Sequence, residues 1–147
     1  MVDVVVIGTG IMGACVAREL SRYNLNVVVL DKENDVSNGT SKANSAIIHA
    51  GYDAANGTLM AKYNVLGNAM FEDLCKEIEA PFKRVGSYVL AFTEEERPHL
   101  ELLYDRGVKN GVPGLEILEG AEVLKREPNL NPNIVAALYA PTAGIVG

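Results

Sequence analysis

Cysteine and histidine are scarce in this sequence, with two of each among 147 residues. Cys15 and Cys75 lie far apart, form no C-x-x-C pair and have no histidine near them in sequence, which argues against a metal site. Two unrelated thiols also provide no disulfide framework. They fit the reducing cytoplasm, which is the location that we expect.

Long runs of one charge sign or of apolar residues are also missing. The 13 basic and 19 acidic residues give a net charge of −6, and no basic stripe is present, so nucleic acid is not an expected partner. No apolar run approaches the length of a membrane span, and the Val-rich start has no basic segment of the kind that opens a secretory leader. We therefore expect a globular protein without a transmembrane segment.

Several catalytic signatures are absent. The sequence has no G-x-S-x-G, no H-E-x-x-H and no G-x-x-x-x-G-K-[ST] motif. The stretch Gly39–Lys42 is not a phosphate-binding loop of that last type, because its lysine follows the hydroxyl residues. These absences leave the corresponding hydrolase, metalloprotease and nucleoside-triphosphatase classes without support.

The first thirty residues have the pattern of a βαβ unit. Residues 2–8 and 25–31 are β-branched, almost uninterrupted apolar runs, which are typical of strands buried on both faces of a parallel sheet. Between them, residues 14–24 carry apolar side chains at helical spacing. The sequence therefore predicts a strand, a glycine turn, a helix and a second strand.

The rest of the chain alternates helices and short strands. A long amphipathic helix is predicted over residues 57–79, a bent strand over 82–92 with the bend at Gly86, and a helix that opens on a capping box at Thr93 and stops at Asn110. A strand at 115–118, a helix at 120–127 and a strand at 134–140 complete the prediction. The apolar stripe expected to face inward on the long helix is Leu59, Tyr63, Leu66, Met70, Leu74 and Ile78.

A glycine fingerprint joins the first predicted strand to the first helix. Gly8, Gly10 and Gly13 form G-x-G-x-x-G, and Asp31 ends the next strand. In dinucleotide-binding folds the first glycine permits the tight turn, the second lets a pyrophosphate approach the backbone, and the third lets the helix pack against the sheet. The helix N-terminus attracts the phosphates, and the acid accepts hydrogen bonds from the ribose hydroxyls. An acid here disfavours NADP, whose 2′-phosphate it would repel.

The fingerprint by itself does not distinguish NAD from FAD. The second strand leads into a long polar segment that ends in "NSAIIHAGY", residues 44–52, rather than into a simple helical crossover. Such a loop offers hydroxyl and amide groups to a second phosphate and a sugar-like chain, and its two isoleucines suit the side of a flat ring. This layout favours FAD, whose adenine and flavin ends lie far apart.

The sequence resembles the FAD-dependent glycerol-3-phosphate dehydrogenases of the D-amino-acid-oxidase-like flavoprotein superfamily. L-2-hydroxyglutarate oxidases are similar over the same residues. The resemblance covers essentially the whole chain and is carried by the glycine fingerprint, which many flavoproteins share, and by the more specific segment "TSKANSAIIHAGY". It implies oxidation of glycerol 3-phosphate to dihydroxyacetone phosphate by hydride transfer to FAD. The implied partners are a small anionic substrate and an electron acceptor that the sequence does not identify.

The resemblance also assigns residues to parts of FAD. It implies that the fingerprint glycines and Asp31 hold the ADP half, that the polar loop contacts the pyrophosphate or ribityl chain, and that residues 47–49 run beside the isoalloxazine. The expected cofactor-binding residues are Gly8, Gly10, Ile11, Met12, Gly13, Asp31, Lys32, Thr40, Ser41, Asn44, Ser45, Ile47 and Ile48.

His49 is the one histidine beside the predicted flavin and is therefore the candidate catalytic base. The alternative is a structural residue that is hydrogen-bonded to the cofactor or to the backbone. We favour the structural role, because catalytic residues in such folds come from several distant segments.

Members of the resembled families are much longer than this chain. We therefore expect an α/β chain with a truncated, Rossmann-like FAD-binding region of the glutathione-reductase type at residues 1–80 and the incomplete start of an α+β substrate domain at 81–147. Such a piece is expected to be inactive alone. The strand at 134–140 is expected to lack some of its pairing partners and to have an exposed edge, which would favour self-association.

Two other functions stay open at this point. One is a flavoenzyme of the same fold that acts on a 2-hydroxy acid or an amino acid. The other is a structural or interaction module without a cofactor.

Overall fold

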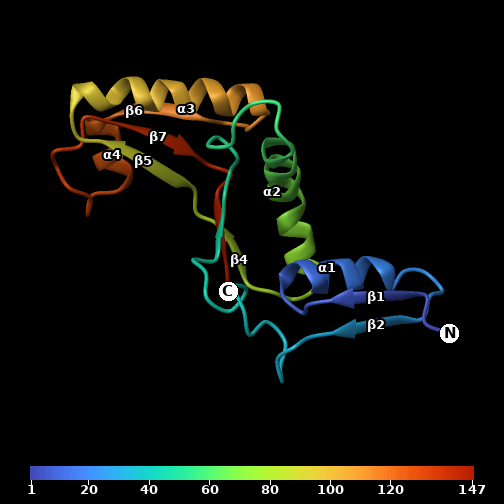
Figure 1. The fold of residues 1–147 in the computed structure, drawn as a ribbon. Coiled ribbons are helices and arrows are strands. Elements are labelled where there is room, and N and C mark those ends of the chain that lie inside the picture. The colour runs from blue at the N-terminus through green and yellow to red at the C-terminus, as the bar shows by residue number, and fades with distance from the viewer. The chain divides into compact units, whose positions relative to one another are not determined.

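A computed structural model describes residues 1–147, and the chain divides into two units, Met1–Ser45 and Ala46–Gly147 (Figure 1). This division by contacts lies well before the boundary at residues 80 and 81 that the sequence indicated. The assignment of a cofactor domain and a substrate domain stays a prediction. None of the helices is both long and apolar enough to cross a membrane.

The first unit is the predicted βαβ unit. Strand β1 (Val4–Ile7) leads through the glycine turn into helix α1 (Ile11–Leu20), and strand β2 (Val27–Leu30) returns beside β1. The two strands pair in parallel, with Val4 opposite Val27 and Ile7 opposite Leu30. The valine-rich runs suit this pairing, because β-branched side chains fit a pleated surface.

The expected burial of these strands on both faces is wrong. Within β1 and β2 only Val6 is buried, whereas Ile7 is 86% exposed and Leu30 53% exposed. The sheet of this unit contains two strands and is accompanied by one helix. The apolar runs are therefore typical of a parallel sheet with helices on both faces, whereas the one helix of this unit covers only part of the two strands.

Helix α2 (Leu59–Glu77) forms where the sequence predicted it, and the Thr58 hydroxyl caps its start by accepting from the Ala61 N–H at 3.2 Å. The predicted inward stripe is wrong: Leu59, Tyr63 and Met70 are each at least 60% exposed. The buried residues of the helix are instead Ala61, Asn68 and Cys75, spaced seven apart. The reason is that Asn68 binds carbonyl oxygens of neighbouring segments, so the face that carries it has to lie inward.

The predicted bend at Gly86 separates two strands of different sheets. Strand β4 (Phe82–Arg84) pairs with β8 (Gly144–Val146), which also pairs with the short strand β3 (Ile47–Ile48). Strand β5 (Ser87–Ala91) belongs to the second sheet of the unit. Gly86 has a φ of +73°, and a Cβ on it would lie 2.6 Å from the Tyr139 ring, so the bend requires glycine.

The second sheet has the strand order β5-β7-β6, with β6 spanning Glu116–Glu119 and β7 spanning Ala136–Ala140. The expectation that β7 lacks some of its partners and has an exposed edge is wrong, because it is the central strand and pairs antiparallel with a neighbour on each side. Its residues alternate between two clusters of buried side chains. Ala136, Leu138 and Ala140 pack with Leu100 and Leu103, whereas Ala137 packs with Val123.

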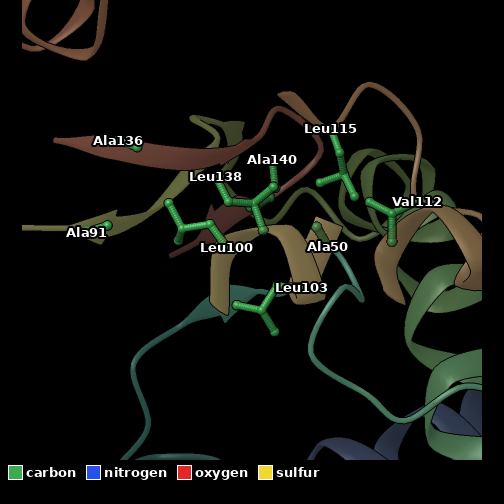
Figure 2. Close-up of a cluster of buried hydrophobic side chains, with 10 residues drawn as sticks. Ala50, Ala91, Leu100, Leu103, Val112, Leu115, Ala136, Leu138 and Ala140 are labelled. Atoms are coloured by element: carbon green, nitrogen blue, oxygen red, sulfur yellow. The ribbon is translucent and has the colours of Figure 1, made fainter. Parts of the chain in front are cut away.

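Helices cover both faces of this sheet. Leu100 and Leu103 belong to α3 (Arg97–Asn110), and Val123 belongs to α4 (Gly120–Arg126). Figure 2 shows Leu100 of α3 beside Leu138 and Ala140 of the central strand. This is a period-two strand buried from both sides, which explains why four of its five residues are buried.

The predicted capping box at Thr93 does not form. A short 3₁₀ helix, η1 (Glu94–Glu96), precedes α3, and the Thr93 side chain makes no capping bond. The Glu96 carboxylate instead accepts from the Phe92 N–H at 2.7 Å. Pro98 lies in the first turn of α3, where its missing N–H has no helical partner to lose.

Replacing Leu138 with Ala should destabilise the second unit by about 2–5 kcal/mol, because this fully buried side chain would leave a cavity between α3 and the sheet. The matched control is Leu102→Ala on α3, whose side chain is 52% exposed, and it should change stability by less than about 0.5 kcal/mol. Urea unfolding followed by circular dichroism measures both. Equal losses in the two variants would contradict the described core.

Candidate functional site

The glycine turn is built on a close contact between α1 and the end of β1. Gly8 has a φ of +100°, a conformation that favours glycine. A Cβ on Gly13 would lie 1.8 Å from the Gly8 carbonyl oxygen, so the first turn of α1 packs directly on the Gly8 peptide. The tight turn and the close packing expected for these two glycines are both observed.

The N-terminus of α1 carries no cap from its own residues. Its N-cap is Gly10, and its first turn contains no acidic side chain. The Ser41 hydroxyl approaches from the polar loop and accepts a hydrogen bond from the Ile11 N–H at 2.8 Å. A Cβ on Gly10 would lie 3.0 Å from that same oxygen. Because glycine has no Cβ, the gap between the helix N-terminus and Ser41 is not filled. Free N–H groups and the helix dipole make such a terminus favourable for an anion.

Asp31 is held at the end of β2 by three hydrogen bonds. The N–H and the hydroxyl of Thr9 each donate to Oδ2 at 2.6 Å, and the Glu33 N–H donates to Oδ1 at 3.0 Å. These bonds lower the pKa of Asp31 from 3.8 to about 2. The bond from the Thr9 hydroxyl contributes most to this shift, followed by those from the N–H groups of Glu33 and Thr9. The carboxylate is therefore ionised and oriented at neutral pH.

These groups surround a cleft of about 440 Å³. It is lined by Ile7, Gly8 and Gly10, by residues 31–33 at the end of β2, and by residues 38–41 of the polar loop. Six of the predicted cofactor-binding residues line it, namely Gly8, Gly10, Asp31, Lys32, Thr40 and Ser41. The predicted fingerprint and polar loop thus meet at one cleft within the first unit.

Sequence reasoning missed several groups at this site. Glu33, Asn38 and Gly39 also line the cleft, and Thr9 holds Asp31. A hydroxyl residue between the first two fingerprint glycines was the available signal for Thr9. Its pairing with Asp31 depends on β1 and β2 lying side by side, which local spacing does not reveal.

The other predicted residues of the first unit lie outside the cleft lining. Ile11 and Met12 are 54% and 76% exposed on the first turn of α1, and Gly13 packs against Gly8. The Asn44 amide donates to the Ser41 carbonyl oxygen at 2.8 Å and so braces the loop. Ser45 is exposed at the last position of the unit. Cofactor contacts of these residues stay predictions.

Ile47, Ile48 and His49 belong to the second unit. The two isoleucines form β3, opposite Ile145 and Gly144 of β8. The His49 side chain is exposed, and its backbone carbonyl accepts hydrogen bonds from Asn64 at 3.1 Å and from Asn68 at 3.0 Å. The position of these residues beside a flavin, and the catalytic role of His49, stay predictions.

The residues of the cleft fit the ADP half of FAD. The N-terminus of α1 has no acidic side chain of its own, and Gly10 leaves its backbone accessible, which suits a pyrophosphate. The ionised Asp31 carboxylate suits a ribose hydroxyl and opposes a 2′-phosphate.

Comparison with known proteins gives relatives that match along almost the whole chain. The chain is 59% identical over all 147 residues to the glycerol 3-phosphate dehydrogenase of Caloramator mitchellensis, and these residues correspond to 31% of that protein. It is 41% identical over 145 residues, 99% of this chain, to the mitochondrial L-2-hydroxyglutarate dehydrogenase of Arabidopsis thaliana, of which it covers 30%. The chain thus spans about a third of the length of these curated relatives.

A solved structure has the same fold. The L-alpha-glycerophosphate oxidase of Mycoplasma pneumoniae, with FAD bound, matches with a TM-score of 0.89 and 36% sequence identity over 98% of this chain and 38% of that chain. The model of the family described as FAD dependent oxidoreductase matches residues 3–147. The chain therefore belongs to the FAD-dependent oxidoreductase family.

Proposed function

We propose that this chain is the FAD-binding part, together with the start of the substrate domain, of an enzyme that oxidises glycerol 3-phosphate to dihydroxyacetone phosphate. The observation that carries the proposal is the 59% identity to a glycerol 3-phosphate dehydrogenase along every residue of the chain. The finer fold assignment, a Rossmann-like region of the glutathione-reductase type followed by an α+β domain, belongs to the same proposal.

The cleft of the first unit is proposed to hold the ADP half of FAD. The diphosphate would lie at the start of α1. There it would accept the hydrogen bond from the Ile11 N–H, which the Ser41 hydroxyl accepts in this structure. Asp31 would accept a hydrogen bond from a ribose hydroxyl through its exposed carboxylate. FAD, when bound, supplies the acceptor for the electrons and hydrogen that leave the substrate alcohol, while the protein binds and orients both molecules.

A second candidate is oxidation of L-2-hydroxyglutarate. It is supported by the 41% identity to the Arabidopsis thaliana dehydrogenase over nearly the whole chain. Glycerol 3-phosphate and L-2-hydroxyglutarate are both anions with a secondary alcohol, so one type of flavin site can oxidise either substrate. Glycerol 3-phosphate stays the first choice because that relative is more similar by 18 percentage points, 59% against 41%.

A pair of hybrid enzymes tests the choice. Residues 1–147 replace the matched region of the Caloramator mitchellensis dehydrogenase in one hybrid and of the Arabidopsis thaliana dehydrogenase in the other. Each purified hybrid is mixed with its parent's substrate without oxygen, and loss of the visible flavin absorbance is followed. We expect the first hybrid to retain FAD and to be bleached by glycerol 3-phosphate at nearly the parental rate.

The outcomes separate the candidates. Efficient bleaching of the second hybrid by L-2-hydroxyglutarate, with a first hybrid that glycerol 3-phosphate leaves oxidised, would favour the second candidate. Hybrids that fold but carry no flavin would contradict the proposed FAD site itself.

Gly10→Ala should weaken FAD binding by about 10-fold to 100-fold, the equivalent of one charge-assisted hydrogen bond to the diphosphate. The fold should survive, because the new Cβ meets only the Ser41 side chain at 3.0 Å. Gly67→Ala on α2 is the control, since a Cβ there has no neighbour within 4 Å. Titration of the deflavinated first hybrid with FAD measures both, and equal affinities would contradict the predicted role of Gly10.

Thr9→Val should raise the pKa of Asp31 from about 2 toward its ordinary value of 3.8, because the hydroxyl that stabilises the carboxylate is removed. In the native chain the Thr9–Asp31 contact should stabilise the fold fully above about pH 3.8 and lose its contribution as the pH falls through about 2. Titration of the Asp31 carboxyl carbon by NMR measures the pKa directly. Thr9→Ser is the control, and a Thr9→Val value as low as that of Thr9→Ser would contradict the described contact.

A further inference from the structure

Asn68 is the single buried polar residue of the chain, with 6% of its surface exposed. Its amide nitrogen donates to the backbone carbonyls of His49 at 3.0 Å and of Thr142 at 2.9 Å. Its side-chain oxygen accepts from Nη1 of Arg84 at 3.0 Å. Both amide hydrogens are therefore used, and the orientation of the amide is determined by its partners.

Arg84 supports the amide from β4. Besides the Asn68 side chain, its guanidinium donates to the Asn68 carbonyl at 3.0 Å and to the Thr142 carbonyl at 2.5 Å. Glu72, one turn further along α2, pairs with Nε of Arg84 at 3.3 Å. The planar guanidinium thus joins α2 to the turn before β8 through several bonds of defined direction.

The network connects two backbone segments that are adjacent in the sheet. His49 follows β3 and Thr142 precedes β8, and these strands pair with Ile48 opposite Gly144. A second amide of α2, that of Asn64, also donates to the His49 carbonyl, at 3.1 Å. Two side chains of one helix therefore converge on the same backbone oxygen.

We propose that Asn68 is a positioning residue that sets the backbone of His49, and with it the direction of the exposed imidazole. The inference rests on the proposed function, because the importance of that direction comes from the predicted place of residues 47–49 beside the flavin. It also explains why α2 turns Asn68 inward and leaves its larger apolar side chains exposed. Burying an amide is unfavourable unless its bonds are made, and here they are all directed at the His49 and Thr142 segments and at Arg84.

The test is Asn68→Asp in the first hybrid enzyme. The substitution keeps the shape and an acceptor for Arg84, but it removes both donors and sets a carboxylate oxygen against two carbonyls. We expect kcat with glycerol 3-phosphate to fall about 10-fold to 100-fold, as misplacement by about 1 Å can cause, with KM changed by less than about threefold. The absorbance band of the bound flavin should also shift.

Two controls separate positioning from stability. Val123→Ala removes a fully buried side chain of the other cluster, which contains no residue next to His49 or Thr142, so it should lower stability and leave kcat unchanged. Asp73→Asn changes one charge on the same helix at a side chain that is 90% exposed, and it should leave both properties unchanged. In the 147-residue chain alone, hydrogen exchange at residues 48–50 and 142–144 should be faster in Asn68→Asp than in either control.

Several results would overturn the inference. One is an unchanged kcat and flavin band in Asn68→Asp, and another is a kcat loss of equal size in Val123→Ala. If glycerol 3-phosphate fails to reduce the wild-type hybrid, the proposed function fails separately. The inference is then decided by the flavin band and the exchange rates, and unchanged values in Asn68→Asp reject it.

Discussion

The cleft depends on the contact between the first turn of α1 and the peptide of Gly8. A single added carbon on Gly13 would overlap the Gly8 carbonyl oxygen, at 1.8 Å. Because the helix lies so close, its N-terminal N–H groups open at the ends of β1 and β2, beside Asp31 and the polar loop. Moving the helix outward to admit a Cβ would separate these groups and remove the convergence that makes the site suitable for a diphosphate and a ribose.

The polar groups of the cleft satisfy one another within the first unit. The Ser41 hydroxyl accepts a hydrogen bond from the Ile11 N–H, and the N–H and hydroxyl of Thr9 both donate to the Asp31 carboxylate. These bonds keep the loop over the helix terminus and the carboxylate ionised, so the site is organised by the protein's own hydroxyl groups. A ligand that binds here exchanges one set of hydrogen bonds for another, and preorganisation of this kind lowers the entropy cost of binding.

The second unit combines an apolar core with one buried polar network. The core lies on the two faces of β7, where small side chains let α3 and α4 approach the sheet. The network lies between α2, β4 and the turn before β8, and it is held by Asn68 and Arg84. The hydrophobic core stabilises the fold through contacts that do not depend on orientation. The hydrogen bonds of the amide and the guanidinium are directional, so they fix the orientation of the His49 segment.

The sequence by itself determined the fingerprint and most of the helices and strands, because these depend on local properties; the short strands β3 and β8 were not predicted. Valine runs favour strands, glycine at position 8 permits a turn with positive φ, and Gly86 marks a bend, and each of these was found where the residues predicted it. Tertiary structure decided which faces are buried and which polar groups meet. The apolar stripe of α2 predicted the wrong buried face of the helix. Apolar periodicity depends only on the spacing of apolar residues and does not include the hydrogen bonds of the buried Asn68 amide. The partners of β7, of Thr9 and of Asn68 lie 16 or more residues away, and such pairings form only when the fold brings those segments together.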